Sequence, residues 1–261
     1  MKTRSYLIFI VVAAALLVTG VSVWASATET DERIESSARK SYVFQTYLKD
    51  DAINIESKDG VVILTGTVAE DSDKTLAQET VANLPGVRKV DNRLEVKNKT
   101  AAENSDMWIS MKVKTALLFN RNVSALTEVA TKDGTVTLRG EAANQAQKDL
   151  TTEHVKDIEG VKNVRNEMTI SKTAGKPDKK TIGESIDDAS VTALVKMTLL
   201  YHRSTSGLRT EVETNKGIVT LRGTAKTAAE KDLVTKYVQD VHGVTSVVNN
   251  ITIEEPKSKS N

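Results

Sequence analysis

The feature that most constrains this chain is a threefold internal repeat marked by glycines at a fixed spacing. In each copy a second glycine follows the first by six residues and a third follows by twenty more, with an asparagine six residues beyond. Such a period predicts three related units built from the same supersecondary elements. The glycines are Gly60, Gly66 and Gly86 in copy one, Gly134, Gly140 and Gly160 in copy two, and Gly217, Gly223 and Gly243 in copy three.

The residues around these glycines predict the order helix, strand, strand, helix, strand. Alternating apolar runs on both sides of the first glycine indicate two strands and a tight turn, because Asp-Gly and Lys-Gly accept positive φ. We expect the second glycine where a helix crosses the strand too closely for a side chain. The third glycine is expected at the C′ position of an amphipathic helix, and an alternating strand follows it.

The pattern predicts an α+β protein of three tandem αββαβ domains, each with two helices packed on a three-stranded mixed sheet. The domains span residues 28–97, 107–170 and 186–254, and the first helix of copy one is irregular. Residues 98–106 and 171–185 are polar and carry lysine, so we interpret them as solvated linkers that let each domain unfold by itself. Residues 255–261 are expected to form a disordered tail.

Residues 1–27 form a separate unit. A basic start precedes the apolar stretch of residues 6–18, and the sequence ASA at residues 25–27 suits a signal peptidase. This pattern predicts a cleaved signal peptide and a periplasmic protein. The alternative is an uncleaved inner-membrane anchor facing the periplasm, because residues 5–28 carry no charge and are long enough to span a bilayer.

The composition excludes several classes of protein. The chain has 36 basic and 35 acidic residues and only 4% aromatic residues, so it offers neither the basic surface nor the stacking platforms of a nucleic-acid binder. It has no cysteine, which excludes disulfides, thiolate metal sites and thiol nucleophiles. Each domain therefore needs a complete apolar core.

A search for catalytic chemistry finds no supporting pattern. His154, His202 and His242 occupy three different positions of the repeat, and no H-x-x-x-H spacing occurs, so we expect surface or capping residues and no metal site. His242 falls at a helix C-terminus, where an imidazolium suits the helix dipole. Neither a phosphate-binding G-K-[ST] motif nor a G-x-S-x-G elbow is present. The sequence predicts no catalytic residue, no cofactor and no enzymatic activity.

One short stretch suggests a binding surface. LLFNRNVSAL at residues 117–126 aligns without a gap with LLYHRSTSGL at residues 199–208, which places an aromatic residue and an arginine at the end of each first helix. On one interpretation the ring enters a membrane interface while the guanidinium binds a phosphate head group. On the other, the ring closes the core and the arginine offsets the helix dipole. The candidate residues are Phe119, Arg121, Tyr201, His202 and Arg203.

The motif G-x-V-x-L-x-G at residues 134–140 and 217–223, with Gly-Val twenty residues later and V-x-N beyond, resembles the BON domain. The resemblance covers nearly all of the chain after residue 27, and multi-copy members of the family are osmotically inducible periplasmic proteins. It implies the αββαβ fold, a periplasmic location, and binding to phospholipid membrane surfaces or envelope proteins during osmotic or envelope stress. It implies no enzymatic activity. The alternative function is a periplasmic chaperone that shields exported client proteins, through exposed sheet edges.

Overall fold

The structure is a computed structural model that describes residues 28–97, 105–123, 127–171, 186–206 and 208–254. The expected signal peptide or anchor, most of both expected linkers and the expected C-terminal tail lie outside these residues. None of the helices in the described ranges has both the length and the apolar character needed to cross a bilayer.

Each copy of the repeat folds in the predicted order of elements. Domain one contains a helix over residues 28–40, α2 (Tyr42–Thr46), β1 (Ala52–Lys58), β2 (Val61–Val68), α3 (Asp71–Ala82), β3 (Lys89–Asn92) and β4 (Glu95–Val96). Domain two contains α4 (Asp106–Phe119), β5 (Glu128–Lys132), β6 (Thr135–Arg139), β7 (Glu141–Ala142), α5 (Gln145–Lys156), β8 (Asn163–Asn166) and β9 (Thr169–Ile170). Domain three contains α6 (Asp188–Tyr201), α7 (Arg203–Ser206), β10 (Thr210–Asn215), β11 (Ile218–Ala225), α8 (Ala228–Gln239) and β12 (Ser246–Ile253).

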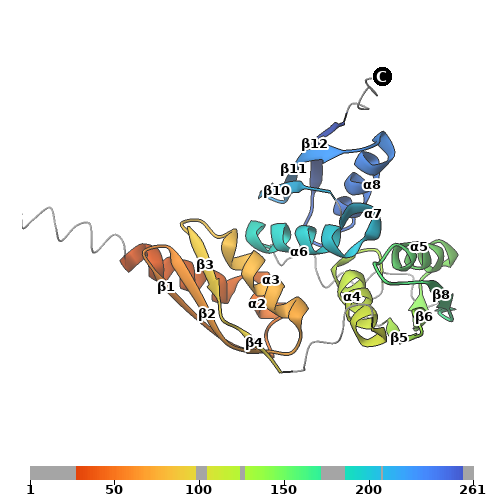
Figure 1. Ribbon diagram of the computed structural model, residues 1–261, viewed down its shortest axis with the longest axis horizontal. Coiled ribbons are helices and arrows are strands. Elements are labelled where there is room, and N and C mark those ends of the chain that lie inside the picture. The colour runs from red at the N-terminus through yellow and green to blue at the C-terminus, as the bar shows by residue number, and fades with distance from the viewer. Residues whose placement is uncertain (1–27, 98–104, 124–126, 172–185, 207, 255–261) are drawn as a thin grey trace, which may run out of the picture.

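Each domain is a two-layer α+β unit, which confirms the predicted fold class. The hairpin strands pair antiparallel, and the last strand pairs parallel with the second, so each sheet is mixed. The irregular first helix of domain one is split at Ser41, whose side chain caps α2. Figure 1 shows the helices of the three domains facing the middle of the molecule and the sheets lying outward. The open sheet faces are therefore the outer surfaces.

The hairpin turns have the geometry that the Asp-Gly and Lys-Gly pairs predict. In domain three the two turn residues, Lys216 and Gly217, have φ values of 51° and 74°, which is the pattern of a type I′ turn. The carboxylate of Asp188, in the first turn of α6, accepts hydrogen bonds from both turn amides at 2.7 and 2.8 Å. Asp31 and Asp106 bind the equivalent turns of the other domains in the same way. The first helix thus fixes the turn of its own hairpin.

Two expectations about the glycines are wrong in detail. A Cβ at Gly223 would lie 2.2 Å from the carbonyl oxygen of Arg209 on the neighbouring chain segment, so a sheet partner and not a crossing helix excludes a side chain there. Gly66 meets Ala52 in the same way, and both β2 and β11 continue past their glycine. The third glycine lies beyond the C′ position, because α8 ends at Gln239 with Asp240 as its C-cap, before Gly243.

The repeated asparagine connects the second helix to the last strand. The Nδ2 group of Asn249 donates to the Lys231 carbonyl at 2.9 Å and to Thr235 Oγ1 at 2.7 Å, and its Oδ1 accepts from the Ile251 amide at 3.0 Å. Asn92 and Asn166 bind their own second helix and the amide two residues later in the same manner. A half-buried amide with three partners explains why this position recurs in every copy.

The three domains share one hydrophobic core, so we now expect them to unfold together and not independently. The helix α6 is buried at eleven of its fourteen positions and packs against α3 of domain one, α4 of domain two and its own β10 and α8. Lys196 of α6 pairs with Glu79 of α3 at 2.9 Å. Asp187 and Ser190 accept hydrogen bonds from the first amides of α2. A helix that is apolar on all sides has to be enclosed, and two neighbouring domains enclose α6.

Replacing Asn249 by alanine should lower the free energy of unfolding by about 1–3 kcal/mol, because the Ile251 amide and the helix carbonyl lose their partner. The matched control is Asn250→Ala, an exposed residue on the same strand, which should change stability by less than about 0.5 kcal/mol. Urea denaturation followed by circular dichroism measures both values. Equal effects of the two substitutions would show that the amide bridge does not stabilise the fold.

Replacing Gly223 by valine should destabilise the whole molecule and not domain three alone. The φ of 140° costs a β-branched residue about 1–3 kcal/mol, and the clash with Arg209 adds to this. Because α6 of domain three packs against both other domains, calorimetry should show a single transition that moves to lower temperature. Thr224→Val, at an exposed position of the same strand, is the control. Loss of one transition with the others unchanged would mean that the domains are energetically separate.

Candidate functional site

The five candidate binding residues come together where domains two and three meet. Phe119 ends α4 and Tyr201 ends α6, and the arginine of each motif follows by two residues. Phe119, Tyr201 and His202 are at most 5% exposed. The two motifs are arranged with approximate twofold symmetry. The motif of domain two contacts domain three, and the motif of domain three contacts domain two.

The backbone contacts between the two domains are reciprocal. The Arg121 amide donates to the Asp240 carbonyl at 2.9 Å, and the Arg203 amide donates to the Asp157 carbonyl at 2.7 Å. In return, the His242 amide donates to Phe119 and the Glu159 amide donates to Tyr201. These bonds form two isolated antiparallel bridges, Asn120 with Val241 and Ile158 with His202. The end of each first helix thus pairs with the end of the other domain's second helix.

Each arginine side chain binds carbonyl groups at the C-terminal end of the other domain's second helix. The Arg121 guanidinium donates to the carbonyl of Val241 at 2.6 Å and also to that of Val244. The Arg203 guanidinium donates to the carbonyls of Lys156, Ile158 and Val161 at 3.0–3.4 Å. A cation at the carbonyl end of a helix is favourable because it opposes the helix dipole. We call this pair of contacts the reciprocal hooks.

The rings of the two motifs face domain one. Phe119 packs edge-on against Tyr47, with ring centroids 5.2 Å apart. Tyr201 lies against the N-terminal end of α3, where burial and the acidic residues led by Asp73 raise its pKa. In this arrangement neither ring is available to a membrane. The rings therefore lie as the alternative interpretation of the sequence expected, because they close the core. The arginines differ from it, since each one offsets the dipole of a helix in the other domain and not of its own helix.

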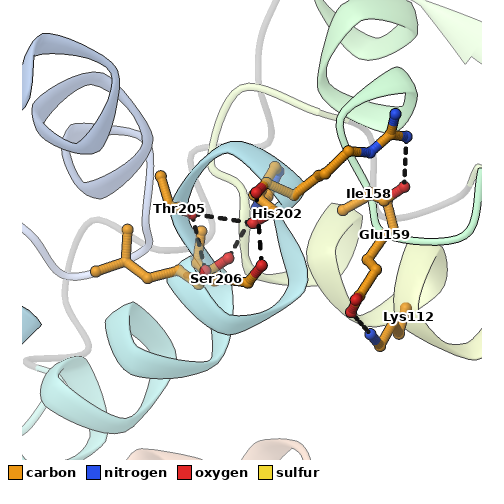
Figure 2. A network of polar contacts seen from close by, with 9 residues as sticks. Lys112, Ile158, Glu159, His202, Thr205 and Ser206 are labelled. Atoms are coloured by element: carbon orange, nitrogen blue, oxygen red, sulfur yellow. Dashed lines mark hydrogen bonds and ion pairs between the residues drawn. The ribbon is translucent and has the colours of Figure 1, made fainter. Parts of the chain in front are cut away.

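A polar network supports the loop after α6. Figure 2 shows His202, Thr205 and Ser206 together, and both the Thr205 and the Ser206 amides donate to the His202 carbonyl, at 3.0 and 2.8 Å. On the domain-two side, Lys112 pairs with Glu159 at 2.7 Å while its Nζ lies 3.6 Å from the centre of the Trp108 ring. These contacts fix the interface residues on the domain-two side and on the domain-three side.

The structure brings together two histidines that the sequence left apart. His154 of α5 and His202 have ring centroids 4.4 Å apart, and Tyr237 of α8 lies 4.1 Å from His202. Burial and the nearby His202 lower the pKa of His154 to about 3, and burial also lowers the pKa of His202. The signal in the sequence was that His154 and Tyr237 each follow the turn glycine of their copy by twenty residues, so they occupy equivalent positions.

The geometry of this cluster does not suit a metal ion. Within the described residues, no group of three histidine, aspartate or glutamate side chains is placed to hold a metal ion. Asp157, the carboxylate beside the cluster, instead accepts hydrogen bonds from Tyr237 at 2.7 Å and from Ser204 at 2.6 Å. His242 is a separate residue at the other half of the interface, where burial and the Arg121 charge lower its pKa.

A second feature lies on the outer side of domain three. β12 is an edge strand of eight residues, Ser246–Ile253, and none of the eight is charged. The equivalent strand is interrupted in the other two domains, and charged residues stand there at the positions equivalent to Val248, namely Asp91 and Arg165. Val248 and Ile253 of β12, and Ile218 of the adjacent strand, are 44–49% exposed. Domain three therefore presents an uncharged strand edge that carries two exposed apolar side chains, Val248 and Ile253.

Removing both hook arginines (Arg121→Ala with Arg203→Ala) should loosen domain two from domain three. Charged hydrogen bonds to carbonyls contribute about 1.5–3 kcal/mol each, so we expect the double variant to lose more stability than either single variant. It should also have a larger radius of gyration in small-angle scattering. The control is Arg139→Ala with Arg222→Ala, since these strand arginines pair within their own domains and are more than half exposed. An unchanged radius in the hook variant would contradict the interpretation.

Comparison with known proteins agrees with the repeat seen in the sequence and structure. The model of the BON domain matches residues 30–98, 105–172 and 187–255. The chain is 30% identical over 191 residues to osmotically inducible protein Y of Escherichia coli strain K12, covering 73% of this chain and 92% of that protein. It is also 30% identical over 138 residues to a 21 kDa hemolysin of Actinobacillus pleuropneumoniae, covering 51% and 71%.

Two solved structures show weaker similarity. CdsD of the type III secretion system of Chlamydia trachomatis is 15% identical, with a TM-score of 0.24 and 82% and 91% of the two chains covered. The periplasmic domain of PrgH is 11% identical, with a TM-score of 0.19 and coverage of 80% and 98%. The family match, in contrast, covers all three repeats and most of the chain. The protein therefore belongs to the BON-domain family.

Proposed function

We propose that this protein is a non-catalytic component of the bacterial envelope that is exported to the periplasm and acts during osmotic stress. Its similarity to an osmotically inducible protein over 92% of that protein's length supports the stress role. We further propose that it acts by binding extended segments of other exported proteins. The uncharged edge of β12 is the single observation that carries this second step.

An edge strand offers unpaired amide and carbonyl groups, to which an extended peptide can add as a further strand. Most proteins block such edges with charges, interruptions or short strands, and domains one and two follow this rule. Arg165 and Glu167 stand in domain two where Val248 and Asn250 stand in β12. The lack of such protection in domain three is a specific difference between otherwise equivalent units.

The contacts around β12 also indicate where a partner strand would pair. The Ile251 amide is already bound by the side chain of Asn249, so the first half of β12, Ser246–Asn249, is the part with room for a partner. Ile218 and Val248 are exposed on the open face beside it. A partner segment rich in β-branched and apolar residues fits this surface, because its side chains would pack on theirs.

Association with phospholipid membranes is a second candidate. Leu118 and Leu200 occupy equivalent positions, each directly before a buried ring, and they are 40% and 49% exposed. Exposed leucines near the ends of two helices suit insertion into the apolar side of a membrane interface. If the protein binds a membrane, we therefore expect Leu118 and Leu200 to contact it, and not the buried rings of Phe119 and Tyr201.

Giving β12 the charges that domain two carries, by Val248→Arg with Asn250→Glu, should abolish client binding. The assay is light scattering of insulin reduced with dithiothreitol, whose released chain aggregates; the protein itself has no cysteine to reduce. We expect the unaltered protein to suppress aggregation and the edge variant to lose at least about 80% of this effect, since charges block strand addition.

Met107→Arg is the control, because Met107 is 69% exposed on α4 of domain two and lies outside the β12 surface. It should keep most of the suppression. Equal activity of the edge variant and the unaltered protein would exclude β12 as the binding site. Co-sedimentation with phosphatidylglycerol vesicles tests the second candidate. Retention that falls in Leu118→Ser with Leu200→Ser, while insulin aggregation is not suppressed, would favour the membrane function over the client function.

A further inference from the structure

The histidine cluster lies in the interface that the reciprocal hooks hold closed. His154 comes from domain two, whereas His202 and Tyr237 come from domain three. His154 is 4% exposed and His202 is fully buried. His154 and Tyr237 occupy equivalent positions of the two domains, and their ring centroids lie 5.5 Å apart. His202 belongs to one of the two bridges, Ile158 with His202, whose counterpart is Asn120 with Val241.

Both imidazole rings have one occupied and one unoccupied nitrogen. His202 Nδ1 lies 2.7 Å from the Thr198 carbonyl oxygen, and His154 bonds to the backbone of Ala116. A nitrogen that faces a carbonyl oxygen carries the hydrogen, so in the neutral ring Nε2 is the unprotonated atom. Neither Nε2 atom has a hydrogen-bond partner among the described residues. Protonation would add a charged N–H group with no acceptor in a buried site, which is costly.

The charged groups around the cluster do not offset this cost. Asp157 favours the protonated form of His202, but burial outweighs it, and its oxygens already accept hydrogen bonds from Tyr237 and Ser204. A groove of about 370 Å³ between α5 and α8 opens beside the cluster and admits solvent. The charged residues along this groove have opposite signs: they are Glu153, Lys156, Asp157, Lys236 and Asp240. Arg203 adds a positive charge on the α7 side, where it binds the helix carbonyls.

We propose that the interface between domains two and three is a latch that acid releases, by protonation of His154 or His202. Opening would free the hooks and expose the Phe119 and Tyr201 loops. The proposal concerns the conformation of the molecule and holds whichever partner the protein binds. In this proposal, pH controls whether the Phe119 and Tyr201 loops are exposed.

The direction of the pH dependence follows from burial. A histidine whose pKa is lowered in the closed state binds its proton more tightly when the domains separate, so the closed state is favoured above the ordinary histidine pKa. Below about pH 6.5, each such histidine raises the opening equilibrium constant up to about tenfold per pH unit. His242 acts in the same direction, because its pKa is also lowered, whereas burial raises the pKa of Asp240 and opposes opening in acid.

The approximate symmetry supplies the matched variants. Tyr237 stands at the position equivalent to His154, and Asn120 stands at the position equivalent to His202. His154→Tyr with His202→Asn therefore places at each site a residue that the same fold already accepts at its counterpart. Neither replacement titrates between pH 4.5 and 7.5, so the variant keeps the interface and removes its two acid-sensitive groups.

Hydrogen exchange at the interdomain amides measures opening directly. The amides of Arg203 and Glu159 donate across the interface, and the amides within β11 serve as internal controls for global unfolding. Between pH 6.5 and 4.5, after correction for the intrinsic exchange rate, the interdomain opening constant should rise by about 100-fold or more in the unaltered protein. In the double variant the rise should be at least about tenfold smaller.

A similar rise in the double variant, or no rise in the unaltered protein, would overturn the proposal. Equal acid sensitivity of the interdomain and β11 amides would also overturn it, because that result means global unfolding. His202→Asn alone is the second variant if the tyrosine does not fit, and it should reduce the acid-induced rise measurably. Circular dichroism at pH 7.5 confirms that each variant is folded.

Discussion

The enclosure of α6 is the constraint on which the rest of the molecule depends. Its sequence, DASVTALVKMTLLY, is apolar around nearly the whole circumference, and its own sheet and second helix cover only part of it. Burial of the remainder is worth about 25 cal/mol for each Å² of apolar surface removed from water. Domain one supplies α3 along one side and domain two supplies α4 along another. The three repeats therefore form one packed body, although their sequences look like a string of separate domains.

The pairing of domains two and three follows from the repeat itself. Two units with the same motif can bind each other in a self-complementary way, because each offers an arginine and each offers the carbonyl end of a helix. Arg121 and Arg203 meet this condition, and Asp157 and Asp240 receive the accompanying backbone bonds. Domain one has no counterpart: its first helix is split, and Tyr47, near the end of α2, instead packs against Phe119. The departure from the repeat in copy one thus corresponds to its different place in the assembly.

The sequence predicted the fold of each single domain correctly, but it did not predict the contacts between the domains. The hairpin turns, the mixed sheets and the order of elements follow from local residue preferences and apolar period, which repeat in every copy. The aromatic and arginine of each motif were identified correctly as unusual, because a ring and a charge at a helix end need partners. Their partners lie in other domains, so no local pattern could name them. The closeness of His154 and His202 depends on the same interdomain geometry. The asparagine position was visible in the spacing, but its three hydrogen bonds required the fold.

The repeat also separates architecture from function, because it supplies two or three versions of each position. Residues that are the same in every copy, such as the turn glycines and Asn249, are explained by backbone geometry and hydrogen bonding within one domain. Residues that differ between equivalent positions cannot be required by the fold, since the fold accepts both. One such difference is histidine at position 154 where the equivalent position 237 has tyrosine, and this histidine adds a buried titratable group to the interface between domains two and three. Another is valine at position 248 where the equivalent position 165 has arginine, and this difference leaves the edge of β12 without charge. The chemistry specific to this protein is therefore concentrated where the copies depart from one another.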